Sequence, residues 1–128
     1  MSKLGTKTVL LLEDTALAAW EIEDELREAG YDVAGNFCSC AKAEQWLENN
    51  SPDAAILDLR LADGTCVPVA RILNARGIPF LLQSAVDPKL GELDDPSLRG
   101  APLVGKPIDT ATMLNILKGL VRPMKAAE

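Results

Sequence analysis

Short uninterrupted hydrophobic segments recur along the chain, and each is followed directly by polar or charged residues. Residues 54–57 are all hydrophobic and lead into Asp58, and residues 9–12 lead into Glu13 and Asp14. Hydrophobic runs of this length are typical of strands that are buried on both faces, as in a parallel sheet. Three further short strands are predicted at 31–35, 77–85 and 103–105.

Segments with helical periodicity separate these strands. Between residues 15 and 30, hydrophobic side chains recur at three- and four-residue steps and therefore share one helix face. Further helices are predicted at 39–49, 68–77 and 109–121. From 87 to 102, repeated prolines and glycines interrupt any period, so the helix expected there should be weak or irregular.

Strands that alternate with helices in this way predict an α/β fold with a doubly wound, five-stranded parallel sheet. Right-handed crossovers would place the strand that ends at Asp58 at the centre of the sheet, beside the strand that ends at Glu13. We expect a single domain over residues 1–128, with a core at about 8–121 and flexible ends.

Composition and charge narrow the class of protein. The 128 residues are 48% hydrophobic and 25% charged, which is ordinary for a chain that folds without disulfides. The net charge of −6 argues against non-specific binding to nucleic acid or to an anionic membrane. No hydrophobic run approaches the ~20 residues of a membrane span. The first residues lack the hydrophobic core of a signal peptide, so a cytoplasmic location is expected.

Three residue types carry further information. Cys38, Cys40 and Cys66 form an odd set without a metal-binding spacing, which favours reduced, packed thiols over a metal or redox site. Trp20 and Trp46 are expected to be packing residues rather than binding platforms. Histidine is absent, which excludes His-dependent nucleophilic catalysis and also means that the chain cannot be a phosphohistidine donor.

The polar residues at the strand ends predict one site at the carboxyl edge of the sheet, where open α/β sheets bind ligands. These residues are Glu13, Asp14, Asp58, Ser84 and Lys106. Three carboxylates and one ammonium leave a surplus of two negative charges, which one divalent cation would neutralise. Mg²⁺ suits such an all-oxygen site.

The same residues suit the transfer of a phosphoryl group to a carboxylate. Asp58 would attack in line and form an aspartyl phosphate. A metal held by Asp14 and Asp58, with Glu13 reached through water, would offset charge on the phosphoryl oxygens. Lys106 would neutralise another oxygen, and Ser84 would donate a hydrogen bond. Positioning and electrostatics supply most of the catalysis in phosphoryl transfer.

With these motifs in order, the chain resembles the receiver domain of bacterial two-component response regulators from end to end. The resemblance implies a flavodoxin-like sheet with strand order 2-1-3-4-5. It also implies that Glu13 and Asp14 bind Mg²⁺ and that the main-chain carbonyl of Arg60 is a further metal ligand. Asp58 would receive its phosphoryl group from a sensor histidine kinase or a histidine phosphotransfer protein.

The resemblance further assigns phosphoryl contacts to Ser84 and Lys106 and implies a cis bond between Lys106 and Pro107. Within the family, residues 67–82 look like stand-alone alphaproteobacterial receivers with a Pro-Phe-x-Phe-Ala-Thr-Gly-Tyr motif. Here that motif is degenerate over residues 79–86.

Other positions also depart from the family pattern. Glu13 replaces the commoner aspartate, and Ala62 stands where a proline is usual. Leu103 occupies the position of the aromatic residue that usually rotates on phosphorylation. We therefore expect phosphorylation to order or reshape residues 85–102 instead.

The function expected is that of a phosphoacceptor, not an enzyme beyond its own phosphorylation and dephosphorylation, that signals through an unknown output protein. The face that carries residues 85–121 is expected to contact that protein, by family resemblance only. One alternative is a receiver fold that acts as a phosphorylation-independent binding module. Another is a small Mg²⁺-dependent phosphatase, for which Asp63 would be the candidate second acid. No nucleic-acid or membrane partner is expected.

Overall fold

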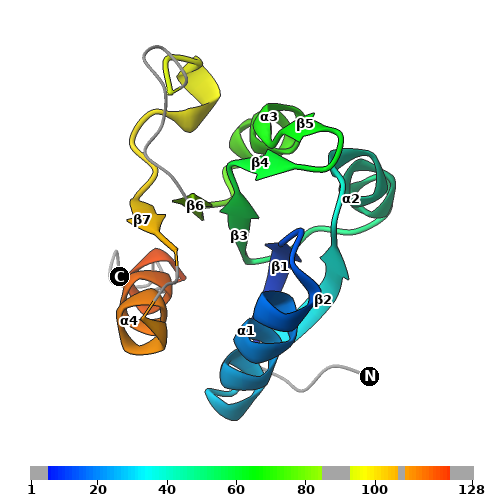
Figure 1. The fold of residues 1–128 in the computed structure, drawn as a ribbon. Coiled ribbons are helices and arrows are strands. Elements are labelled where there is room, and N and C mark those ends of the chain that lie inside the picture. Colours follow the sequence, from blue (N-terminus) through cyan, green and yellow to red (C-terminus); the bar gives the residue numbers. More distant parts are fainter. Residues whose placement is uncertain (1–5, 85–92, 107–108, 122–128) are drawn as a thin grey trace.

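The sheet has five parallel strands, in the order β2-β1-β3-β6-β7 (Figure 1). The computed structural model describes residues 6–84, 93–106 and 109–121. The strands are β1 (Thr8–Leu12), β2 (Asp32–Phe37), β3 (Ala54–Asp58), β6 (Phe80–Ser84) and β7 (Leu103–Gly105). Strands β4 and β5 form a separate small hairpin, so β6 and β7 are the fourth and fifth strands of the main sheet. The predicted doubly wound sheet and its strand order 2-1-3-4-5 are therefore confirmed.

That hairpin was not predicted from the sequence. It consists of β4 (Arg60–Leu61) and β5 (Gly64–Thr65), which pair antiparallel directly after the central strand. Gly64 has a φ of 128°, a backbone conformation that residues other than glycine rarely adopt. A glycine is thus needed where the chain reverses, and the segment is too short to give a strand pattern in the sequence.

Helices cover both faces of the sheet (Figure 1). They are α1 (Ala16–Glu28), α2 (Cys40–Leu47), α3 (Val67–Ala75) and α4 (Thr110–Leu120). Helices α1 and α4 lie on one face, and α2 and α3 lie on the other. None of the described helices is long and hydrophobic enough to cross a membrane.

The central strand β3 is buried at all five of its positions. Because successive strand residues point to opposite faces, Ala55 and Leu57 pack with α2 and α3, whereas Ala54 and Ile56 pack with α1 and α4. Both sides of β3 are therefore hydrophobic, which explains its uninterrupted sequence.

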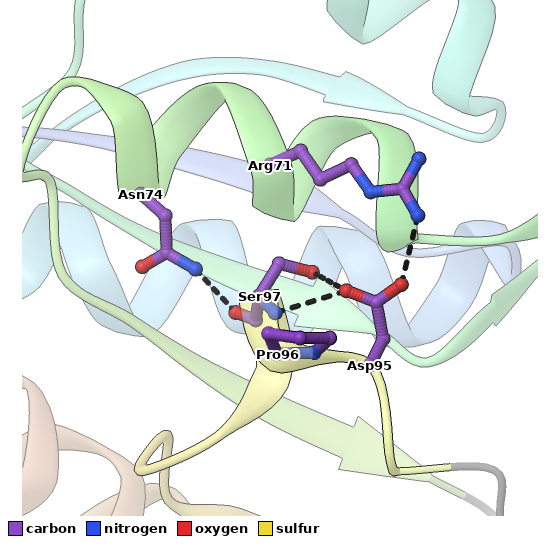
Figure 2. A pocket seen from close by; sticks show the side chains of 5 residues that line it. All are labelled: Arg71, Asn74, Asp95, Pro96 and Ser97. Atoms are coloured by element: carbon purple, nitrogen blue, oxygen red, sulfur yellow. Dashed lines mark hydrogen bonds and ion pairs between the residues drawn. The ribbon is translucent and has the colours of Figure 1, made fainter.

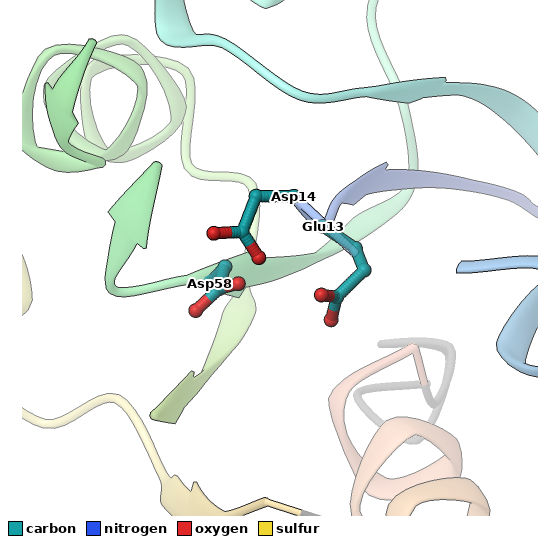
Figure 3. A group of neighbouring side chains, drawn as sticks. All are labelled: Glu13, Asp14 and Asp58. Atoms are coloured by element: carbon teal, nitrogen blue, oxygen red, sulfur yellow. The ribbon is translucent and has the colours of Figure 1, made fainter. Parts of the chain in front are cut away.

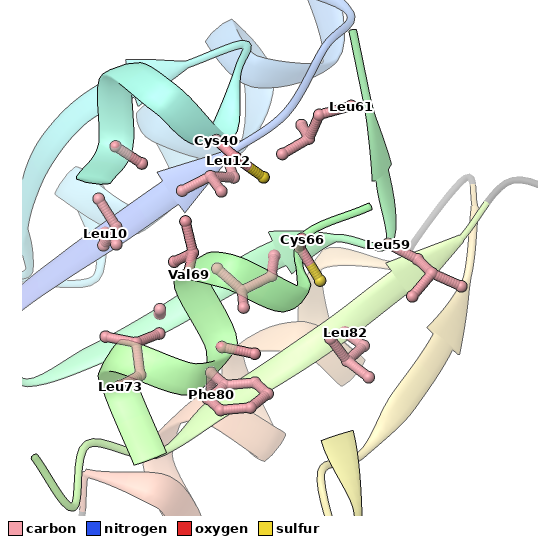
Figure 4. Packing of buried hydrophobic residues seen from close by; sticks show 14 of the residues in the cluster. Leu10, Leu12, Cys40, Leu59, Leu61, Cys66, Val69, Leu73, Phe80 and Leu82 are labelled. Atoms are coloured by element: carbon pink, nitrogen blue, oxygen red, sulfur yellow. The ribbon is translucent and has the colours of Figure 1, made fainter. Parts of the chain in front are cut away.

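Two of the three cysteines are part of this core. Cys40 and Cys66 are buried in the cluster between the sheet and helices α2 and α3 (Figure 4). Burial raises the pKa of the Cys40 thiol to about 11 and that of Cys66 to about 12. The predicted packing is confirmed for these two residues, while Cys38 is exposed.

The two tryptophans differ in their packing. Trp46 is partly buried, with its ring centroid 6.3 Å from that of Phe37. Trp20 is 64% exposed, so its prediction as a packing residue is wrong. In α1 it follows Ala19, and adjacent helix positions are about 100° apart, so it lies off the buried face.

The expected fourth helix is replaced, within the described residues, by a short 3₁₀ helix η1 (Pro96–Leu98). Asp95 caps it, and Arg71 and Asn74 of α3 bind Asp95 and the Ser97 carbonyl (Figure 2). The predicted irregularity is confirmed for this part. Residues 85–92 lie outside the described residues, so the expected reshaping of 85–102 stays a prediction.

Candidate functional site

The acidic residues that follow β1 and end β3 meet at the carboxyl edge of the sheet (Figure 3). Leu12 of β1 pairs with Leu57 of β3, so the residues that come next lie side by side. Carboxylate oxygens of Glu13, Asp14 and Asp58 all lie within 4.8 Å of one another. Glu13 and Asp58 are buried, whereas Asp14 is exposed. The cluster predicted from the strand ends is therefore formed, and it opens to solvent at Asp14.

Lys106 brings one positive charge into this cluster. Its Nζ atom donates to Glu13 Oε2 and to Asp58 Oδ2, both at 2.8 Å, and lies 3.9 Å from Asp14 Oδ1. The backbone N–H of Lys106 donates to the carbonyl of Ser84, which holds the end of β7 against β6. One ammonium among three carboxylates leaves the predicted surplus of two negative charges.

The donor set fits a small divalent cation. It consists of hard carboxylate oxygens, the preferred ligands of Mg²⁺, and its net charge matches a doubly charged ion. The exposed Asp14 carboxylate can reach an ion that keeps several of its waters, as Mg²⁺ usually does.

Ser84 and Arg60, the other predicted site residues, lie near this edge of the sheet. Ser84 is the last residue of β6 and is buried. Arg60 comes two residues after Asp58 and begins the β4–β5 hairpin. Pro107 lies outside the described residues, and so does the predicted cis bond.

Sequence reasoning missed Gln83, which contacts the site directly. Its side chain is fully buried, and Nε2 donates to Glu13 Oε1 at 2.9 Å. The sequence feature that could have indicated Gln83 is its position as a polar residue directly after the hydrophobic part of the predicted strand at 77–85. Its meaning depended on the register, which pairs Gln83 with Asp58.

Asp63, the candidate second acid of a phosphatase, is engaged elsewhere. Its carboxylate accepts hydrogen bonds from the backbone N–H groups of Cys40 and Ala41, at 2.9 and 3.1 Å. These donors belong to the first turn of α2, whose N–H groups lack partners within the helix. The hydrogen bonds keep the pKa of Asp63 below its usual value and tie the β4–β5 hairpin to α2.

The buried position of Asp58 strongly affects the pKa of its carboxyl group. Burial raises its pKa to about 6, helped by the negative charge of Glu13 and partly offset by Lys106. Burial alone would raise the pKa of Asp14. Hydrogen bonds with Asp58 and Glu13 and the charge of Lys106 outweigh this effect, so the pKa of Asp14 is lowered. In Lys106, hydrogen bonds to Asp58 and Glu13 outweigh burial and raise the pKa.

The raised pKa of Asp58 predicts that the stability of the chain depends on pH in metal-free buffer. The carboxyl group of Asp58 titrates near pH 6 in the folded chain and near 3.8 when unfolded, so the folded state holds its proton to higher pH. The contribution of Asp58 to the free energy of unfolding should therefore fall as the pH rises from about 4 to 6, by about 1–3 kcal/mol. Urea unfolding of the native chain and of Asp58→Asn at several pH values measures it.

Asp24→Asn is the matched control for this experiment, since Asp24 is exposed on α1. The stability difference between the native chain and Asp58→Asn should change with pH, and the difference from Asp24→Asn should not. Parallel pH profiles for all three proteins would contradict the raised pKa.

Comparisons with known proteins point to one family. No family model matches the chain. The transcriptional regulatory protein PdtaR of Mycobacterium tuberculosis is 29% identical over 80 residues, which are 62% of this chain and 39% of PdtaR. The chain thus spans about two fifths of the length of this relative.

Solved structures cover nearly the whole chain. The receiver domain of the response regulator PhyR from Erythrobacter litoralis is 27% identical, with a TM-score of 0.76 over 92% of each chain. SdrG from Sphingomonas melonis Fr1 is 31% identical, with a TM-score of 0.72 over 91% of this chain and 97% of SdrG. The chain is a response regulator receiver domain, as its sequence motifs indicated.

Proposed function

We propose that the chain is a phosphoacceptor in a two-component phosphorelay and that Asp58 carries the phosphoryl group. The observation that supports this most directly is the position of Asp58, buried between Lys106 and two further acids at the open edge of the sheet. This is the predicted arrangement of nucleophile, counter-charge and metal ligands.

The proposed donor of the phosphoryl group is a phosphohistidine on another protein; this chain has no histidine and cannot supply one itself. The family resemblance makes that protein a sensor histidine kinase or a histidine phosphotransfer protein. An Asp58 carboxylate oxygen attacks phosphorus, the P–N bond breaks, and its electron pair stays on the departing imidazole, which takes up a proton. No turnover is proposed beyond the phosphorylation and dephosphorylation of Asp58.

Each residue of the cluster has a distinct part in this step. Asp14 and Asp58, with the main-chain carbonyl of Arg60, would hold Mg²⁺, and Glu13 would reach it through water. When bound, Mg²⁺ offsets negative charge on the phosphoryl oxygens. Lys106 moves from Asp58 to a phosphoryl oxygen, and Ser84 donates a hydrogen bond to another. The phosphorylated form then signals through an output protein that the resemblance does not name.

Labelling with acetyl phosphate tests this function. In the presence of Mg²⁺, the native chain should gain one phosphoryl group by intact-mass measurement. Asp58→Asn should gain none, because an amide cannot attack phosphorus, and Asp24→Asn should behave like the native chain. Omitting Mg²⁺ should reduce the initial rate of labelling by at least tenfold, equivalent to about 1.4 kcal/mol of transition-state stabilisation.

A native chain that takes no label would favour the alternative of a phosphorylation-independent binding module. Leu103 supports that alternative, because it is a partly exposed aliphatic residue where a switching aromatic is usual. Equal labelling of the native chain and Asp58→Asn would place the phosphoryl group on another residue. The phosphatase alternative loses support, since Asp63 is hydrogen-bonded at the start of α2.

A further inference from the structure

Gln83 lies on the same face of the sheet as the buried acids. Strand residues two apart share a face, so Gln83 belongs with Leu81, Asp58 with Ile56, and the residue after β1, Glu13, with Leu11. All three of these hydrophobic residues pack on the side of α1 and α4. Gln83 therefore continues a hydrophobic stripe at the point where that stripe meets the carboxylates.

The amide of Gln83 completes the surroundings of Glu13. Oε1 of Glu13 accepts from Gln83 Nε2 at 2.9 Å, while Oε2 accepts from Lys106 Nζ at 2.8 Å and from the backbone N–H of Thr15 at 2.9 Å. Each carboxylate oxygen is thus held from a different strand end, and Gln83 is what fixes the Oε1 side. A side chain without an N–H donor at position 83 would remove this hydrogen bond and hold the Glu13 carboxylate less firmly.

The other end of the same amide has no hydrogen-bond partner among the described residues. Within the part of the chain that the structure describes, Gln83 Oε1 is the one buried side-chain oxygen or nitrogen without a hydrogen bond. A buried acceptor without a donor costs free energy, and a hydrophobic side chain of similar shape would avoid that cost. The unpaired oxygen of Gln83 is explained if a water molecule bound to the cation donates a hydrogen bond to it.

We propose that Gln83 is a positioning residue of the cation site, which orients Glu13 through its amide nitrogen and offers its amide oxygen to a water of the bound ion. This inference rests on the proposed function, because it assumes that the acidic cluster holds a divalent cation. It adds a determinant that none of the motifs of the chain contains. Groups that orient metal ligands from the second layer typically change metal affinity by about 10–100-fold.

Binding of Mn²⁺, measured from the free-ion signal in electron paramagnetic resonance with Mg²⁺ as competitor, tests the proposal. Gln83→Met keeps the length of the side chain but removes both polar ends, and it should weaken Mn²⁺ binding by about tenfold or more. Gln45→Met makes the same chemical change at an exposed position of α2 and should leave binding unchanged. Gln83→Asn keeps an amide but withdraws it by one methylene, and it should weaken binding as Gln83→Met does.

A second background shows whether Gln83 acts through Glu13. In Glu13→Gln, the carboxylate that Gln83 holds is gone and only the contact of its amide oxygen with a water of the ion remains. Adding Gln83→Met should therefore weaken Mn²⁺ binding less than it does in the native chain, by less than about threefold. An equal loss in both backgrounds would overturn the positioning role, and so would unchanged or tighter binding in Gln83→Met. If Gln83→Met does not fold by circular dichroism, Gln83→Asn decides by the same criterion.

The outcome also separates this inference from the proposed function. A native chain that binds Mn²⁺, loses it in Asp14→Asn and keeps it in both Gln83 variants would refute the role of Gln83 alone. A native chain that does not bind Mn²⁺ would refute the cation site itself, and the role of Gln83 with it.

Discussion

Replacing Lys106 by methionine should destabilise the chain by about 3–5 kcal/mol at pH 8, because two buried carboxylates lose their counter-charge. Nζ of Lys106 contacts both Glu13 and Asp58 at 2.8 Å, and the side chain is only 16% exposed. The loss should shrink at pH 5, since burial and the charge of Glu13 favour the protonated form of Asp58. It should also shrink on addition of Mg²⁺, which supplies positive charge to the same carboxylates.

The free energy of unfolding in urea measures this effect at both pH values, with and without Mg²⁺. Lys118→Met is the matched control, because Lys118 is exposed in the last turn of α4 and has no described ion pair. It should change stability by less than about 0.5 kcal/mol. If the two variants were equally stable at pH 8, Lys106 would not be the counter-charge that holds the acidic cluster together.

Leu73→Ala should cost about 2–5 kcal/mol, the range typical of leucine truncations in a close-packed core. Leu73 is fully buried between α3 and the sheet (Figure 4). Leu17 is the matched control, because it is a leucine of helix α1 that is 67% exposed. Leu17→Ala should change the free energy of unfolding by less than about 0.5 kcal/mol. Thermal and urea unfolding of the two variants, at one pH, compare them directly.

The contrast between these leucines checks the packing of the face that α2 and α3 cover. A small effect of Leu73→Ala would mean that the site can collapse around the missing atoms or that α3 packs loosely. A large effect of Leu17→Ala would mean that the exposed part of α1 contacts another part of the chain.

The sequence by itself determined most of the fold. The runs 9–12 and 54–57 are hydrophobic at every position, and only strands that are covered on both faces need such runs. The prolines and glycines between 87 and 102 also indicated an irregular segment, and within the described residues η1 is all that forms there.

The sequence also located the acidic site, since the carboxyl ends of parallel strands meet at one edge. The sequence alone therefore groups Glu13, Asp14, Asp58 and Lys106, and the structure brings all four together.

Only the tertiary structure decided which polar side chains face each other at that edge. Gln83 and Asp63 are ordinary polar residues in the sequence, but register and loop geometry bring one to Glu13 and the other to the start of α2. Trp20 was misjudged because side-chain size favours burial in general, while the phase of α1 turns this residue outward. The physical reason is that hydrophobic periodicity is local, whereas hydrogen-bond partners and burial depend on contacts between segments far apart in the chain.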